Sequence, residues 1–146
     1  MVKTLLNEVK EYKKDTILSP VYVSIEAILE VFIPFLMAIL VDNGIEKGDM
    51  KSIWFYGFLM LVAAFVSLWA GAKSGKHAAI ASSGFAKNLR KAEYHNIQNF
   101  SFSNIDAYST SGLITRMMTD VTNIQNAYQM IIRICVRAPL MLIASL

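Results

Sequence analysis

The stretch ILSPVYVSIEAILEVFIPFLMAILV, residues 17–41, decides the fold class of this chain. Apart from two serines, two prolines and two glutamates, its side chains are apolar. At ~1.5 Å per residue, a helix of about 25 residues measures roughly 37 Å, which is enough to cross a hydrocarbon core of ~30 Å with some tilt. The stretch therefore predicts a first transmembrane helix. It is also too long for the apolar region of a cleaved signal peptide, so we expect it to remain as a membrane anchor.

A second apolar stretch follows after a short polar segment. Residues 42–52 contain Asn43-Gly44 and Gly48-Asp49, which are typical turn residues, so the chain is expected to reverse there in an external loop. Residues 53–72 are then apolar or small, with Trp54 and Trp69 near the two ends, where aromatic side chains favour the membrane interface. This pattern predicts a second transmembrane helix.

The composition agrees with an all-α integral membrane protein. Hydrophobic residues make up 55% of the chain and charged residues 17%, against roughly 45–50% and about 25% in an average soluble domain. The 14 Lys and Arg residues are scattered, so no basic patch suggests a nucleic-acid partner. The single cysteine, Cys135, can form neither an intramolecular disulfide nor a metal site with a second cysteine.

Residues 1–16 are predicted to form an amphipathic helix. Val2, Leu5, Leu6, Val9 and Tyr12 recur at steps of three and four residues, with lysines elsewhere around the turn. We expect this helix to lie on the membrane surface. The alternative is a solvated helical N-terminus without lipid contact.

The distribution of Lys and Arg predicts the orientation in the membrane. Four of them precede the first span, two lie in the loop 42–52, and six lie between Lys73 and Arg116. Cytoplasmic segments carry the excess of these residues. We therefore expect a multi-pass protein of the plasma membrane whose N-terminus and long segment after Ala72 are cytoplasmic.

The segment after the second span predicts a helical hairpin over residues 73–138. Helix-favouring residues continue from Lys73 to Phe100, which would extend the second helix by about 40 Å beyond the bilayer. The turn-rich string SFSNIDAYSTSG, residues 101–112, breaks the helix, and a returning helix is expected from Leu113. A third span is expected to begin in residues 139–146, where the chain stops within an apolar run, as if cut off. With this late entry, Arg133 and Arg137 are expected at or just below the headgroups. An earlier entry would bury both in hydrocarbon, at about 2.5–3.5 kcal/mol each.

Glu26 and Glu30 are the candidate residues of a substrate path. They lie four residues apart, on one face of the first predicted span. Acids at that depth usually face a wet or protein-lined cavity. The alternative, which the sequence leaves open, is that they pair with a basic residue on a neighbouring helix.

The remaining motifs predict no catalytic or metal site in this chain. The string GAKSGKHAA, residues 71–79, resembles part of a phosphate-binding loop but lacks the first glycine, the Ser or Thr after the lysine and a preceding strand. His77 and His95 have no cysteine or paired carboxylate nearby in sequence, so both are expected to be surface or packing residues. Glu93, Asp106 and Asp120 are well separated along the chain, and no catalytic constellation is apparent.

The string from Arg90 to Leu140 resembles the first intracellular loop of ATP-binding cassette exporters of the multidrug half-transporter kind. The family pattern is a short aromatic segment followed by a Thr-Gly-Leu motif, an arginine and an aspartate. The matching residues are Phe102, Ile105, Asp106, Ser111, Gly112, Leu113, Ile114, Thr115, Arg116, Asp120, Val121 and Ile124. Residues 41–45, VDNGI, are also similar to the end of the family's first helix. Ser111 replaces the usual threonine, a small change because both are small and polar.

The resemblance implies part of a six-helix transmembrane domain of an exporter for drugs, lipids or peptides. The family works as a homo- or heterodimer, with ATP and Mg²⁺ bound on a nucleotide-binding domain outside this chain, so this chain itself is expected to carry no cofactor and no enzymatic activity. The resemblance also assigns a coupling helix, which contacts that domain, to Phe102, Ser103, Asn104, Ile105, Asp106, Ala107, Tyr108 and Ser109. Arg116 and Asp120 would brace the returning helix. The alternative is a membrane-anchored sensory or scaffold module whose hairpin binds a partner protein.

Overall fold

The computed structural model describes residues 8–98 and 110–145, and this part of the chain is almost entirely helical. A short 3₁₀ helix, η1 (Lys10–Tyr12), leads into α2 (Lys13–Leu40), which ends in a π-helical turn, η2 (Val41–Ile45). The long helix α3 (Met50–Gln98) follows. After residues 99–109, the chain returns through α5 (Thr110–Thr115), the π-helical turn η3 (Arg116–Asp120) and α6 (Val121–Ser145).

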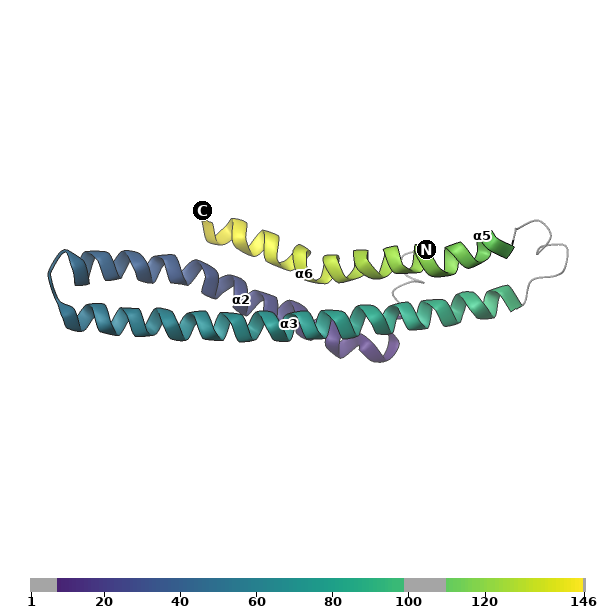
Figure 1. Cartoon of the computed structure of the whole chain (residues 1–146), viewed down its shortest axis with the longest axis horizontal. Coiled ribbons are helices and arrows are strands. Elements are labelled where there is room, and N and C mark those ends of the chain that lie inside the picture. The colour runs from purple at the N-terminus through teal and green to yellow at the C-terminus, as the bar shows by residue number, and fades with distance from the viewer. Residues whose placement is uncertain (1–7, 99–109, 146) are drawn as a thin grey trace.

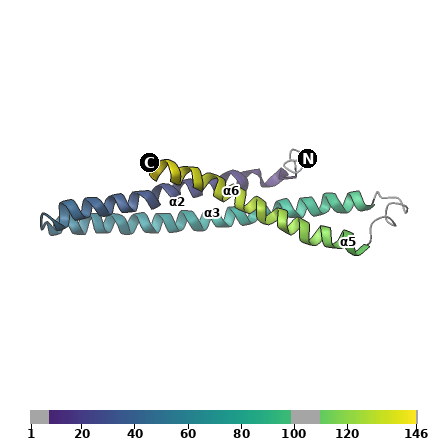
Figure 2. The ribbon, with the colours of Figure 1, turned by 90° about the horizontal axis from the view of Figure 1, so that it is seen from above.

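Three helical segments are long and apolar enough to cross a membrane, and they fall at Lys10–Ile45, Met50–Gln98 and Met117–Ala144. Figure 1 shows α2 and α3 side by side over the first half of α3, with α6 along its second half. Figure 2 shows that α6 crosses α3 obliquely, so that the C-terminal part of α6 lies beside α2. The described residues thus form an elongated helical assembly in which α3 is the common element.

Small side chains allow α2 and α3 to approach closely. Ala63, Ala70, Ser74 and Ala78 of α3 are buried and recur at steps of four and seven residues, so they share one face of the helix. In membranes such small residues let helix backbones come together, because lipid gives little hydrophobic drive for association. At this interface Ser74 Oγ donates a hydrogen bond to the Ser19 carbonyl oxygen over 3.2 Å.

The predicted boundaries of the loop differ from the structure. Helix α2 begins at Lys13, inside the segment 1–16 that is itself predicted to be helical, and continues through the first predicted span. The predicted external loop 42–52 is largely helical, since η2 continues from α2 and α3 begins at Met50. The reversal is confined to residues 46–49, where Gly48 adopts a positive φ of 64°, a conformation that glycine accepts without strain.

The N-terminal segment differs from the surface helix predicted for residues 1–16. Residues 1–7 lie outside the described part of the chain, and residues 10–12 form the 3₁₀ turn. Val9 is only 4% exposed and belongs to a cluster formed mainly by α3 and α6, against which Tyr12 also packs. The apolar face formed by these two residues therefore packs against protein, because α3 offers a groove there: Gly84 lies directly beneath the Tyr12 ring.

Candidate functional site

The two acids of α2 share one arginine of α6. Arg137 donates a hydrogen bond from Nη2 to both carboxylate oxygens of Glu30, each over 2.8 Å. Its Nη1 atom lies 3.6 Å from Glu26 Oε1, within ion-pair distance. The Glu26 side chain is 15% exposed and that of Glu30 33% exposed. Of the two alternatives left open by the sequence, the structure contains the second, in which the acids pair with a basic residue on a neighbouring helix.

This pairing changes the expected depth of Arg137. Glu30 lies 13 residues into the apolar stretch 17–41, which is about 20 Å along a helix. Arg137 reaches Glu30 directly, so it lies within the membrane-spanning assembly rather than at or just below the headgroups, as the sequence had suggested. The two carboxylates explain the difference, because they offset the cost of placing a guanidinium at that depth.

Helix α3 leaves room for the Glu26 side chain in this cluster. Gly71 faces Glu26, and a Cβ atom at that position would lie 3.0 Å from the Glu26 carboxylate carbon. A larger side chain would therefore push the carboxylate away from Arg137. The Oε2 atom of Glu26 is buried and has no hydrogen-bond partner among the described residues.

Arg133 lies one helical turn before Arg137 and behaves differently. Its side chain forms neither an ion pair nor a hydrogen bond with any of the residues that the structure describes. It borders two grooves. One, of about 470 Å³, also contains Glu26, Glu30 and Ser67. The other, of about 500 Å³, is lined by both arginines and by the amide side chains of Asn126 and Gln129.

A polar layer joins the helices near the beginning of α2. His77 Nδ1 lies 2.6 Å from Asp15 Oδ1, and the imidazole ring stacks on Tyr22 with ring centroids 5.6 Å apart. Thr16 Oγ1 lies 2.8 Å from the hydroxyl of Tyr128 on α6. His77 is thus a packing residue that links α3 to α2.

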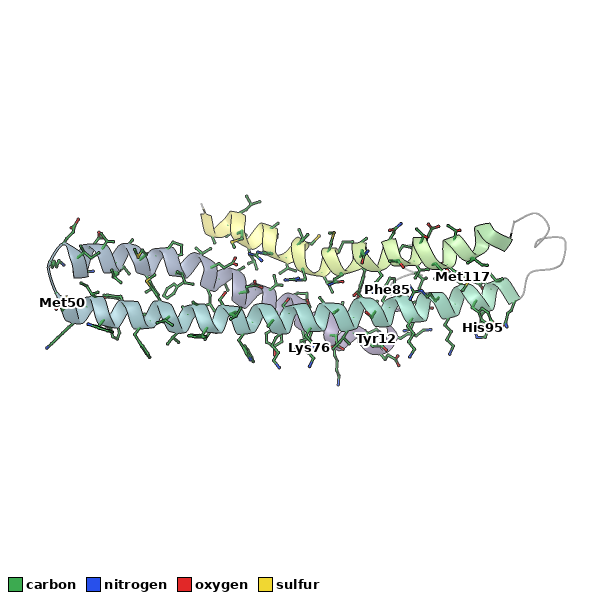
Figure 3. All side chains as sticks on the ribbon, in the orientation of Figure 1. Tyr12, Met50, Lys76, Phe85, His95 and Met117 are labelled. Carbon is green, nitrogen blue, oxygen red and sulfur yellow. The ribbon has the colours of Figure 1, made fainter. Side chains whose placement is uncertain are left out.

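Beyond this layer, an apolar core holds α3 and α6 together. Phe85 and Tyr128 stack with ring centroids 4.7 Å apart, and Val121 is fully buried beside them. Figure 3 shows Phe85 between the two helices, while His95 lies near the far end of α3 and points away from α6. The hairpin is therefore a packed unit rather than two independent helices. The stack could not be predicted from the sequence, since a lone aromatic on each helix gives no pairing signal.

The hairpin also brings two acids together that are distant in sequence. Burial raises the pKa of Glu93, and the negative charge of Asp120 raises it further. The Oε2 atom of Glu93 is buried without a hydrogen-bond partner among the described residues. These two acids are well separated along the chain, but its return brings Asp120 close enough for its charge to act on Glu93.

The predicted coupling residues, from Phe102 to Ser109, lie outside the described residues, as does the side chain of Arg116. Asp120 is exposed at the end of η3. In residues 8–98 and 110–145, no group of three or more His, Cys, Asp or Glu side chains could hold a metal ion.

The comparisons with known proteins agree on one family. The chain matches the family described as ABC transporter transmembrane region over residues 16–146. It is 38% identical over 117 residues to YfiB of Bacillus subtilis, named as an uncharacterized ABC transporter ATP-binding protein, and this match covers 80% of the chain and 20% of YfiB. It is 24% identical over 153 residues to Rv1273c of Mycobacterium tuberculosis and to Mb1304c of Mycobacterium bovis, which bear the same description.

Each mycobacterial match covers the whole of this chain and 25% of the relative. The chain therefore spans a fifth to a quarter of the length of these relatives. Three observations agree with one another. The chain has three membrane-compatible helices, residues 8–98 and 110–145 contain no strand, and the family match covers nine-tenths of its length. The chain is membrane-embedded and all-α, and it belongs to the ABC transporter transmembrane region family.

Proposed function

We propose that this chain is the N-terminal part of the transmembrane domain of an ATP-driven exporter and that its α3–α6 hairpin couples ATP hydrolysis to the membrane helices. The observation that carries the proposal is the length of α3, 49 residues in one helix. At ~1.5 Å per residue it measures about 73 Å, more than twice the ~30 Å needed to cross a hydrocarbon core. About 40 Å of α3 therefore extends beyond the membrane.

The hairpin is suited to transmit movement. The Phe85–Tyr128 stack and the buried Val121 fix α6 to α3, and Thr16 and Asp15 tie both helices to α2. A displacement at the far end is then carried to the membrane as rotation of a rigid body rather than lost in local bending. Within this proposal, residues 102–109 are the segment that contacts the nucleotide-binding domain, and Arg116 and Asp120 brace it.

The proposal includes partners and an orientation. The relatives are named ATP-binding proteins and are four to five times longer than their matched region, which supports a nucleotide-binding domain elsewhere in the complete transporter. ATP and Mg²⁺ would bind there, and a second half-transporter, identical or different, would complete the substrate path. The excess of Lys and Arg after Ala72 favours a cytoplasmic hairpin in the plasma membrane.

A cross-linking experiment tests the contact between hairpin and ATPase domain. The native cysteine is first removed by Cys135→Ser, and a cysteine is introduced by Ile105→Cys in the complete transporter. We expect this cysteine to cross-link to the nucleotide-binding domain. A matched control, Ile80→Cys, changes an exposed residue near the base of the hairpin and should not cross-link to it. Cross-linking of Ile105→Cys only to a soluble partner protein would instead support the scaffold alternative.

A further inference from the structure

The charges of α2 and α6 have the same spacing on two helices that run in the same direction. Glu26 and Glu30 lie four residues apart on α2, and Arg133 and Arg137 lie four residues apart on α6. Figure 1 shows both helices running from right to left along the molecule. Four residues rise about 6 Å along each helix. The contact between Arg137 and Glu30 sets the register of the two helices. One turn earlier, the same register brings Arg133 to the level of Glu26.

Glu26 is the less satisfied acid of the cluster, although it is the more buried one. Its side chain is 15% exposed, against 33% for that of Glu30. Arg137 donates its hydrogen bonds to Glu30, whereas its distance of 3.6 Å to Glu26 is within ion-pair range but too long for a hydrogen bond. The Oε2 atom of Glu26 has no hydrogen-bond partner in the described part of the chain. Because a buried carboxylate is costly without such partners, Glu26 would gain from a second donor.

Arg133 is placed to supply that donor. It borders the groove of about 470 Å³ that also contains Glu26. Within residues 8–98 and 110–145, its side chain has neither an ion pair nor a hydrogen bond. Gly71 of α3 lines the same groove and leaves space beside the Glu26 carboxylate. An unpaired guanidinium group and a poorly satisfied carboxylate of opposite charge therefore border one space.

A proline next to this cluster gives α6 a point at which it can bend. Pro139 lies inside α6, two residues after Arg137. Proline has no backbone N–H, so the carbonyl group of Cys135 lacks the hydrogen bond that a helix normally provides from this position. The interrupted turn begins after Arg133 and includes Arg137. Bending at this turn changes the position of Arg137 relative to Arg133, while the earlier part of α6 stays packed on α3.

We propose that Arg133 is the alternative partner of Glu26, so that the cluster has two pairings. In the pairing that the structure contains, Arg137 contacts both acids. In the second pairing, Arg133 binds Glu26 while Arg137 keeps Glu30, and every charge of the cluster then has a partner of its own. Such a cluster can hold α6 against α2 in either of two positions. The second pairing needs neither ATP nor a second subunit, so it can be tested separately from the proposed function.

The test measures how much Arg133 contributes to stability when Arg137 is removed. The complete protein is unfolded in mixed micelles with increasing dodecyl sulfate, and Arg133→Gln is made in the parent and in Arg137→Gln. In the parent we expect Arg133→Gln to change the unfolding equilibrium constant by less than about threefold, because Arg137 still contacts both acids. In Arg137→Gln we expect a change of about tenfold or more, which is what loss of a hydrogen bond between charged groups produces. With Glu26→Gln also present, the change should fall to about threefold or less.

Three results would overturn the proposal. The same change from Arg133→Gln in both backgrounds would show that Arg133 is not a second partner, and a tenfold change that persists with Glu26→Gln would assign it to Glu30. Lys73→Gln is the matched control, because it removes a positive charge of α3 that lies over Trp69 and outside the groove. An equal change from Lys73→Gln would show a general effect of charge.

A second background covers the case in which Arg137→Gln does not fold. Arg137→Lys keeps the positive charge but lacks the planar fork that reaches two carboxylates at once. Arg133→Gln should then change the unfolding equilibrium constant by at least about threefold more in Arg137→Lys than in the parent. Equal changes in these two backgrounds would also contradict the proposal.

Discussion

Removal of Arg137 should be among the most damaging single changes to the membrane-spanning part of this protein. The variant Arg137→Ala leaves the carboxylates of Glu26 and Glu30 without their shared partner. At an effective dielectric constant of ~20, the Coulomb attraction is about 6 kcal/mol at the 2.8 Å distance to Glu30 and about 5 kcal/mol at the 3.6 Å distance to Glu26. These are gross attractions, and the cost of desolvating both charges offsets much of them; the pair is also only partly enclosed, since the Arg137 side chain is 41% exposed. Breaking a buried pair costs about 3–5 kcal/mol, and we expect about 3 kcal/mol here.

A double-mutant cycle isolates the pair. Neutralising both partners with Glu30→Gln and Arg137→Gln leaves fewer unpaired charges, so the double variant should be more stable than Arg137→Gln alone. We expect a coupling energy of about 1.5–3 kcal/mol, as for hydrogen bonds between charged groups. The assay is equilibrium unfolding of the complete protein in mixed micelles with increasing dodecyl sulfate. A coupling energy below about 0.5 kcal/mol would refute the assignment of this pair as the link between α2 and α6.

Three further changes test the packing of the described helices. Glu93→Gln should stabilise the hairpin at neutral pH. The pKa of Glu93 is raised in the folded state, so its favourable contribution to folding stability at low pH is lost as the pH rises through that pKa. The gain in stability from the variant should therefore vanish in melting curves below about pH 4.5. Gly84→Ala should lower the free energy of unfolding by about 1–3 kcal/mol and displace the Tyr12 ring, which fluorescence or proteolysis of the N-terminal segment would report. Tyr12→Ala in the same background should recover part of the lost stability. Ala70→Leu should separate α2 from α3 and lower the unfolding midpoint, whereas Ala79→Leu, at an exposed position of α3, should not. Equal midpoints would contradict the small-residue interface.

Hydrophobic blocks and helix-favouring composition were sufficient to predict the helical spans and the continuous extension of α3. These features depend on local sequence. The limits of the loop 42–52 were less accurate, because residues 50–52 follow turn-forming residues yet are compatible with a helix. The inward packing of Val9 also could not be predicted, since an apolar face fits lipid and protein equally well.

The charged cluster could be predicted only in part. Glu26 and Glu30 were identified as a pair, and so were two arginines, Arg133 and Arg137, at the same spacing of four residues. That repeated spacing was the available signal for an interhelical pair. The sequence does not give the position of α6 along the axis of α2. That position brings Arg137 rather than Arg133 into contact with the acids. Long-range packing determines this position.

The central claim, that the hairpin couples an ATPase domain to the membrane helices, is tested most directly by Ile105→Ala in the complete transporter. Basal ATP hydrolysis, substrate-stimulated hydrolysis and export are measured together in proteoliposomes. Truncation of an apolar anchor should cost about 1–3 kcal/mol of docking. We expect that the variant inserts and still hydrolyses ATP but loses substrate stimulation and export together. Unchanged stimulation with unchanged export would contradict it.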